Sequence, residues 1–194
     1  MKCRSLILLF AALLICGSGV AATKNPGKAA RVQALEFEVG ASIITPSEKL
    51  NFDKKSVGWN LAAELRYNCP TRPFDFGLRI DGDGFNRKLT LNKESFKFRS
   101  YNALFLVDLN INRQGIITPF IGVGLGAGIY DNEQHIAASD ITKERLKGAT
   151  FCCMPRVGVE VIHRIRVTLY YKYFLTANSH FGLSLGFAMG GRRK

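Results

Sequence analysis

Side chains suited to nucleophilic chemistry are adjacent at one point of the chain, Ser179-His180. A serine activated by a histidine, with a carboxylate to orient the ring, attacks acyl groups. The other histidines, His135 and His163, lie far from this pair in the sequence. Adjacent residues on an extended strand point to opposite sides, so Ser179 and His180 would diverge. We therefore predict no catalytic residue and interpret His180 as a solvated loop histidine.

Two short patterns resemble ligand-binding motifs. Residues 122–127 (Gly-Val-Gly-Leu-Gly-Ala) match a dinucleotide fingerprint, but that signal needs a following helix, and here apolar alternation continues to Ile129. We expect these glycines to make room for a bulky neighbour such as Phe120 or Tyr130. Asp81-Gly82-Asp83-Gly84 resembles a calcium loop whose glycine comes too early. We predict neither a cofactor nor a metal, and interpret residues 81–84 as a strand end, with weak divalent binding as the alternative.

Both motifs lie in a pattern that repeats eight times from Gln33 onward. About ten residues alternate apolar with small or polar, and a break at Gly, Pro, Asn or Asp follows. Such alternation indicates β-strands, and about 9–11 residues suffice to cross a membrane. In the fourth repeat the phase slips, which predicts a β-bulge near Arg99-Ser100. The predicted strands are 33–45, 56–68, 74–85, 95–110, 117–130, 149–162, 165–175 and 181–190.

The fold class predicted is all-β, an eight-stranded antiparallel up-and-down transmembrane β-barrel. An eight-stranded barrel is just wide enough inside for side chains to fill, so it cannot hold every large apolar residue. The apolar face must point outward into lipid, and the face rich in Gly and small polar groups lines the lumen. Buried charges then have to pair, because a lone buried charge is costly. The charges concerned are Arg66, Arg79, Arg156, Arg166 and Lys172 with Glu64, Asp108 and Glu160.

Short connections (69–73, 111–116 and 163–164) alternate with longer polar ones (46–55, 86–94, 131–148 and 176–180). Outer-membrane barrels have short periplasmic turns and longer extracellular loops, so we expect both termini in the periplasm. We expect an extracellular partner, if any, at loop 131–148. Aromatic residues near strand ends predict girdles at the two lipid interfaces. They are Trp59, Tyr67, Phe74, Phe85, Tyr130, Phe151, Tyr171, Tyr173 and Phe181.

The first residues have the three zones of a secretory signal peptide. Lys2 and Arg4 precede an apolar run that ends at Ile15, and small residues lead to a cleavage site after Ala22. We predict a signal peptide at 1–22 and one barrel domain at 23–194; a lipoprotein signal on Cys16 is the disfavoured alternative. Cleavage lowers the formal net charge from +12 to +10. The basic residues are scattered, so we expect lipid phosphates or lumen carboxylates as their partners and no nucleic acid.

Three cysteines remain after the predicted leader, Cys69, Cys152 and Cys153. An odd number is not a disulfide framework, and adjacent cysteines on a strand face opposite sides. We interpret all three as packing thiols.

Several segments resemble the small outer-membrane β-barrel proteins common in Bacteroides-type bacteria, within the OmpA/OmpX-like, porin-like group. They are 61–68 (LAAELRYN), 118–126 (TPFIGVGLG), 154–160 (MPRVGVE) and 183–187 (LSLGF). The resemblance implies a Gram-negative outer membrane and insertion by the barrel-assembly machinery, whose terminal signal Gly182, Leu185 and Phe187 fit. Phe181 and the extension through Lys194 depart from that signal.

These observations predict an integral protein of the cell outer membrane with a structural, adhesion or surface-interaction role and no catalysis. Its expected partners are outer-membrane lipid and lipopolysaccharide, and possible extracellular ligands of the loops. Three alternatives stay open. One is a narrow pore, the second is a lipid A-modifying enzyme with Ser179 and His180, and the third is a soluble periplasmic ligand-binding barrel.

Overall fold

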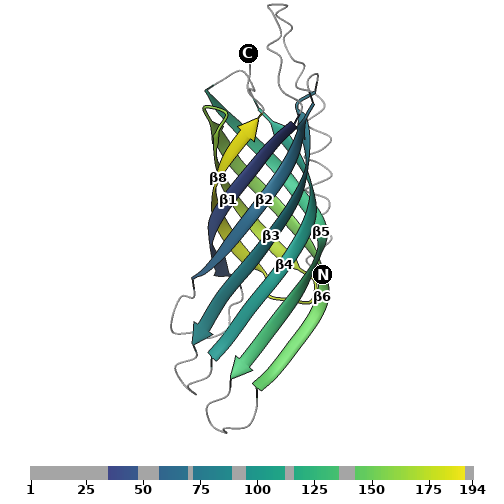
Figure 1. The fold of residues 1–194 in the computed structure, drawn as a ribbon, viewed down its shortest axis with the longest axis vertical. Helices are drawn as coiled ribbons and strands as arrows, with labels where there is room; N and C mark the ends of the chain where they lie inside the picture. Colours follow the sequence, from purple (N-terminus) through teal and green to yellow (C-terminus); the bar gives the residue numbers. More distant parts are fainter. Residues whose placement is uncertain are drawn as a thin grey trace, which may run out of the picture. The chain divides into compact units, whose positions relative to one another are not determined.

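The structure, a computed structural model, describes residues 35–47, 57–69, 72–88, 95–111, 116–135 and 143–190, which together form one closed β-barrel (Figure 1). The predicted leader at 1–22 lies outside the described residues. The strands are β1 (Leu35–Pro46), β2 (Gly58–Asn68), β3 (Phe74–Lys88), β4 (Ser95–Asn110), β5 (Ile117–His135), β6 (Lys143–Val161), β7 (Ile165–Phe174) and β8 (His180–Gly190).

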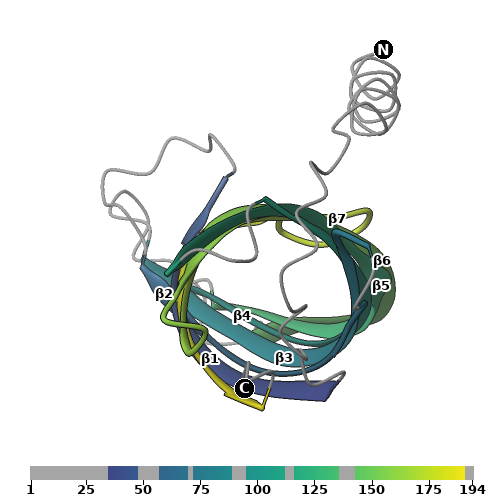
Figure 2. The ribbon, with the colours of Figure 1, turned by 90° about the horizontal axis from the view of Figure 1, so that it is seen from above.

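Each strand pairs antiparallel with its neighbours in the sequence, and β1 pairs with β8 to close the ring (Figure 2). We call the end with connections 47–57, 89–94, 136–142 and 175–179 the loop end, and the end with connections 69–73, 111–116 and 162–164 the turn end. The predicted up-and-down barrel is thus confirmed. Among the described residues, no helix is long and apolar enough to cross a membrane.

The outward face of the strands is mainly apolar, and the face toward the lumen is mainly small or polar, as the alternation predicts. Along β1, Leu35 and Ile43 are 61% and 65% exposed, whereas Glu36 and Ser42 between them are 5% and 6% exposed. The same division holds along β2, β7 and β8. A continuous exterior of exposed Leu, Ile, Val and aromatic side chains is suited to a lipid bilayer, and the ring pairs each strand with a neighbour on both sides.

The predicted bulge near Arg99-Ser100 is wrong. β4 pairs with β3 in one uninterrupted register from Ser95 to Asn110. The apparent slip arises because Phe98 is a lumen residue, fully buried, with its ring centroid 4.7 Å from that of Phe85. Large apolar residues therefore occupy inward positions, which the alternation pattern had assigned to small or polar ones.

Apolar side chains fill the loop-end half of the lumen. The buried cluster comprises Ile44, Phe85, Phe98, Leu104, Leu106, Cys152, Met154, Tyr170 and Phe174, and Tyr130 packs against it. Phe85 and Tyr130 are thus wrong as girdle residues, while the other seven predicted aromatics occupy outward positions. The glycines of β5 provide the room: a Cβ at Gly124 would lie 2.7 Å from Leu106 Cδ2. A β5 glycine thus accommodates a bulky neighbour, as expected, but the neighbour is Leu106; the predicted Phe120 and Tyr130 rings lie against Gly158 and Gly148 instead.

Four neighbouring strands extend past the rest of the barrel. β3 to β6 have 15, 16, 19 and 19 residues, against 10 to 12 for β1, β2, β7 and β8. Their loop ends form what we call the extended sheet, residues 84–88, 95–99, 131–135 and 143–147. It projects at the bottom of Figure 1. The predicted loops 86–94 and 131–148 are therefore wrong in extent, since their outer parts are paired strand.

Cys69, Cys152 and Cys153 form no disulfide in the described part of the chain. Cys152 is buried in the lumen cluster, and Cys153 follows it on the opposite face of β6. The position of Cys152 agrees with the prediction of a packing thiol.

Candidate functional site

The turn-end half of the lumen is crossed by a guanidinium group. Arg156 on β6 donates from Nη1 and Nη2 to the two carboxylate oxygens of Glu64 on β2, at 2.8 and 2.9 Å. Its Nε also donates to Asp108 Oδ1 on β4 at 2.9 Å. In a closed ring of eight strands, β2 and β6 face each other. Arg156 therefore spans the barrel, and such two-pronged charge-assisted bonds are strong.

Further buried charges surround this bridge. Arg66 donates to Glu36, Glu38 and Glu64 at 2.5, 2.7 and 2.6 Å. Arg166 on β7 donates to Asp108 and Glu160, both at 3.2 Å, and its guanidinium carbon lies 4.1 Å from the centre of the Phe120 ring. The predicted pairing of buried charges is confirmed, and Glu36 and Glu38 join it as partners that the prediction did not include.

A second charged cluster lies among the residues of the apolar cluster, with Tyr170 and Phe174 on either side of Lys172 along β7. Lys172 on β7 donates from Nζ to Asp83 Oδ2 on β3 at 2.8 Å and also binds Asp81. Asn60 donates to Asp83 Oδ1 at 2.7 Å, and Asn102 donates to Asp81 Oδ1 at 2.8 Å. The interpretation of residues 81–84 as a strand end at a loop is thus wrong: β3 continues to Lys88, and both aspartates face a lysine inside the barrel. No three His, Cys, Asp or Glu side chains of the described residues gather as a metal site would require.

His180 is a lumen residue. It begins β8, is fully buried, and its Nε2 lies 3.3 Å from Asp83 Oδ1, with the rings of Tyr170 and Phe174 beside it. The interpretation as a solvated loop histidine is therefore wrong. The strand begins one residue before the predicted boundary, and that shift turns the ring into the lumen.

Ser179 points away from His180. Its Oγ accepts a hydrogen bond from the Phe174 backbone N–H at 3.1 Å, and its carbonyl accepts one from Ser47 Oγ at 3.1 Å. The other histidines are elsewhere: His135 ends β5, and His163 lies on the β6–β7 turn with Nδ1 3.4 Å from Glu160 Oε1. The structure brings together no serine, histidine and carboxylate at the membrane surface among the residues it describes.

Residues 122–127, the dinucleotide-like motif, lie in the middle of β5, which continues as strand to His135. The helix that such a motif requires does not follow. At Gly122 a side chain is excluded, because a Cβ there would lie 1.9 Å from the Asp108 carboxylate oxygen that binds Arg156. The glycine serves the lumen network.

The outward face of the extended sheet is charged where the barrel wall is apolar. In register across β4, β5 and β6 lie Arg99, Asp131 and Lys147, and the next outward row is Lys97, Glu133 and Arg145. These two rows together contain four cationic side chains and two carboxylates. Arg145 Nε donates to Asp131 Oδ1 at 2.9 Å, and this hydrogen bond holds the pKa of the Asp131 carboxyl below its ordinary value. The change from apolar to charged marks where lipid contact ends.

The extended sheet is the feature that sequence reasoning missed. A usable signal was the complementary order of charges, since Asp131 and Glu133 align with Lys147 and Arg145 in a hairpin register. Opposite charges directly across an antiparallel pair stabilise it.

Solved structures of two bacterial proteins share this architecture. The attachment invasion locus protein Ail of Yersinia pestis, solved in complex with the heparin analogue sucrose octasulfate, matches with a TM-score of 0.51 at 14% identity, over 82% of this chain and 100% of that chain. Neisserial surface protein A matches with a TM-score of 0.51 at 14% identity, over 82% and 99%. The fold is that of the small outer-membrane β-barrels. No protein-family model and no curated protein sequence matches the chain.

Proposed function

We propose that the protein is an integral outer-membrane barrel of a Gram-negative bacterium, related to the Bacteroides-type small barrels, that acts at the cell surface through its extended sheet. The observation that carries the proposal is the paired extension of β3 to β6 beyond the apolar wall, with a charged outward face. A barrel needs only about 9–11 residues per strand to cross the membrane. Strands of 19 residues therefore present structure outside it.

The filled lumen favours a surface role over a pore. Arg156 and Lys172 each connect strands on opposite walls, and the apolar cluster closes the loop-end half. The lipid A-modifying alternative loses its candidate pair, because Ser179 and His180 point apart. A soluble ligand-binding barrel would carry its apolar face inward, whereas Leu78 and Ile80 here are 61% and 65% exposed on the exterior.

Thiol labelling on intact cells tests the placement. Glu133→Cys puts a thiol on the outward face of the extended sheet, and Arg164→Cys puts one on the turn at the other end. With a membrane-impermeant maleimide we expect Glu133→Cys to label in intact cells. Arg164→Cys should label above the wild-type background only after the outer membrane is opened. The reverse pattern, or a soluble protein whose gel migration does not change on boiling, would contradict the proposal.

A polyanion is the first probe of the surface role. The Ail structure contains a sulfated saccharide, and the outward face of the extended sheet carries an excess of cations among its described residues. We expect detergent-refolded protein to be retained on a heparin column and to elute with salt. Lys97→Gln with Arg145→Gln should lower the salt needed for elution, while Arg164→Gln on the turn should not. Equal elution of both variants would exclude the extended sheet as the binding surface.

A further inference from the structure

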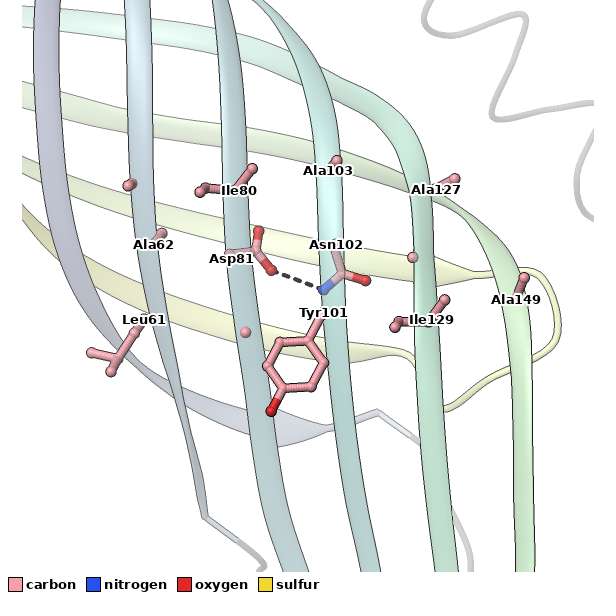
Figure 3. Close-up of a pocket in the computed structure, with 13 residues that line it drawn as sticks. Leu61, Ala62, Ile80, Asp81, Tyr101, Asn102, Ala103, Ala127, Ile129 and Ala149 are labelled. Carbon is pink, nitrogen blue, oxygen red and sulfur yellow. Dashed lines mark hydrogen bonds between the residues drawn. The ribbon is translucent and has the colours of Figure 1, made fainter.

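The lipid-facing wall has a hollow next to the extended sheet, on the turn-end side of that sheet. The hollow, of about 730 Å³, lies across β2 to β6. Small residues on neighbouring strands line it, namely Gly82, Ala103, Ala127 and Ala149. Figure 3 shows the three alanines with Tyr101 and Ile129 beside them. Asp81 and Asn102, also labelled there, hydrogen-bond to each other on the lumen side of the same wall.

A ridge bounds this hollow toward the turn end. In register across β3, β4 and β5 lie Leu78, Phe105 and Leu125, which are 61%, 49% and 47% exposed. Small side chains between bulky ones leave a groove that an acyl chain can fill. A bilayer whose chains pack against such a wall gains contact area there that a smooth wall does not offer.

Cations bound the hollow toward the loop end. Arg99 lies two residues beyond Tyr101 on β4, and Lys147 lies two residues from Ala149 on β6. Between them Asp131 is engaged by Arg145. Two cations of this row therefore flank one carboxylate, at the level where the apolar wall ends, which is where lipid phosphates lie.

We propose that this hollow and its cationic row form a binding site for one phosphorylated, multiply acylated glycolipid of the outer leaflet, the chemistry of lipid A. An acyl chain lies on the floor at Ala103 and Ala127, and a phosphate lies between Arg99 and Lys147. The site rests on the membrane placement proposed above and deepens it by naming the lipid and the residues that select it. Tyr101 is at the depth that amphipathic aromatics prefer.

The charge favours a lipid over a second copy of the chain as the occupant. A symmetric dimer through this face would bring two cationic rows together, and like charges at close range are unfavourable. A lipid with two phosphates neutralises the row instead. A zwitterionic phospholipid supplies less negative charge at the same depth. We therefore expect the site to bind the doubly phosphorylated lipid in preference to a zwitterionic phospholipid.

The single tryptophan of the chain reports on this site. Trp59 is 54% exposed, packs over Gly84, and lies in the same row as Arg99. Full-length protein is reconstituted in nanodiscs of brominated phosphatidylcholine, which quenches tryptophan. Bis-phosphorylated hexa-acyl lipid A then replaces an increasing share of the lipid, and its displacement of brominated chains restores fluorescence. Monophosphorylated lipid A and unbrominated phosphatidylcholine serve as comparison lipids.

We expect fluorescence to recover at a lower mole fraction of bis-phosphorylated lipid A than of either comparison lipid. Arg99→Gln and Lys147→Gln should each raise the fraction needed about fivefold, the effect of about one lost lipid–cation contact. Ala103→Phe, which fills the floor, should raise it as well. Two controls should behave as wild type: Arg164→Gln at the turn end, and Val167→Phe on the lipid-facing side of β7.

Equal recovery with all three lipids would overturn the site, and so would Arg99→Gln and Lys147→Gln behaving as wild type. A dimer in sedimentation that Ala103→Phe dissociates would make a second copy the occupant and would also overturn it. Gel migration with and without boiling confirms for each variant that the barrel has formed. Because thiol labelling tests membrane placement separately, a failed lipid site leaves that result intact.

Discussion

Lys172 and Asp83 lie on opposite walls of the barrel, yet Lys172 Nζ is 2.8 Å from Asp83 Oδ2. β3 and β7 are four strands apart in a ring of eight, so this bond crosses the lumen. Both side chains are fully buried. Two kinds of interaction therefore stabilise the barrel. Backbone pairing joins neighbouring strands around the ring, and side-chain ion pairs such as this one join opposite walls across the lumen.

Lys172→Met should destabilise the barrel by about 3–5 kcal/mol, because it leaves Asp83 buried without its lysine, whereas Asp81 keeps the Arg79 guanidinium at 2.9 Å. Urea unfolding of the refolded protein, followed by Trp59 fluorescence, measures the change. Lys147→Met, which removes an exposed lysine on the extended sheet, is the matched control and should change stability by less than about 0.5 kcal/mol.

A double variant distinguishes the cost of leaving a carboxylate buried without a partner from the stabilisation that the ion pair itself provides. Lys172→Met combined with Asp83→Asn also removes the carboxylate charge that the single variant leaves without its lysine, so the double variant should recover part of the lost stability. If the single variant is as stable as Lys147→Met, the bond across the lumen contributes nothing and the account of the second cluster fails.

The wild-type barrel should not conduct in planar bilayers. Arg156 and Lys172 bridge opposite walls at two levels, and Phe98 and Phe174 close the loop-end half with ring centroids 6.1 Å apart. Replacing Phe98 and Phe174 with Ala removes the apolar closure but leaves both charged bridges, so we expect the double variant to remain closed to ions. Steady single-channel steps from the wild type would favour the pore instead.

The alternation of the sequence predicts which face of each strand meets lipid, because that division depends only on residue type and a period of two. It could not place Phe98 inside, since that inward ring packs against Phe85 and Phe174 on other strands, and alternation within one strand does not locate those partners. Nor could it place His180. The strand begins at His180 and not at residue 181, and this difference of one residue places the ring in the lumen and not in a solvated loop. The alternation did not predict the extended sheet, because the outward positions there carry charged residues such as Asp131 and Glu133. Without apolar residues at every second position, the sequence no longer shows the pattern of a membrane-spanning strand.

Cells that express the protein should show unchanged lipid A. Ser179 Oγ is engaged by the Phe174 backbone N–H, and the His180 ring faces Asp83 in the lumen, so neither reaches an acyl ester in the membrane. Mass spectrometry of lipid A from cells with wild-type protein, Ser179→Ala and an empty vector makes the comparison. An acyl or phosphate change that appears with wild type and vanishes with Ser179→Ala would establish an enzyme.

Gly122→Ala should destabilise the barrel by about 1–3 kcal/mol, the usual cost of forcing an extra group into a packed interior. The added Cβ would lie 1.9 Å from Asp108 Oδ1 and 2.7 Å from the Val107 carbonyl oxygen, so Asp108 has to leave Arg156 or the backbone has to shift. Gly82→Ala is the matched control, because its Cβ would face lipid with the Tyr101 ring at 3.5 Å, an ordinary contact. Urea unfolding of both variants in the same detergent compares them directly. Equal stability of the two would mean that the glycines of β5 are not required by the lumen network, and that Asp108 can hold Arg156 from another position.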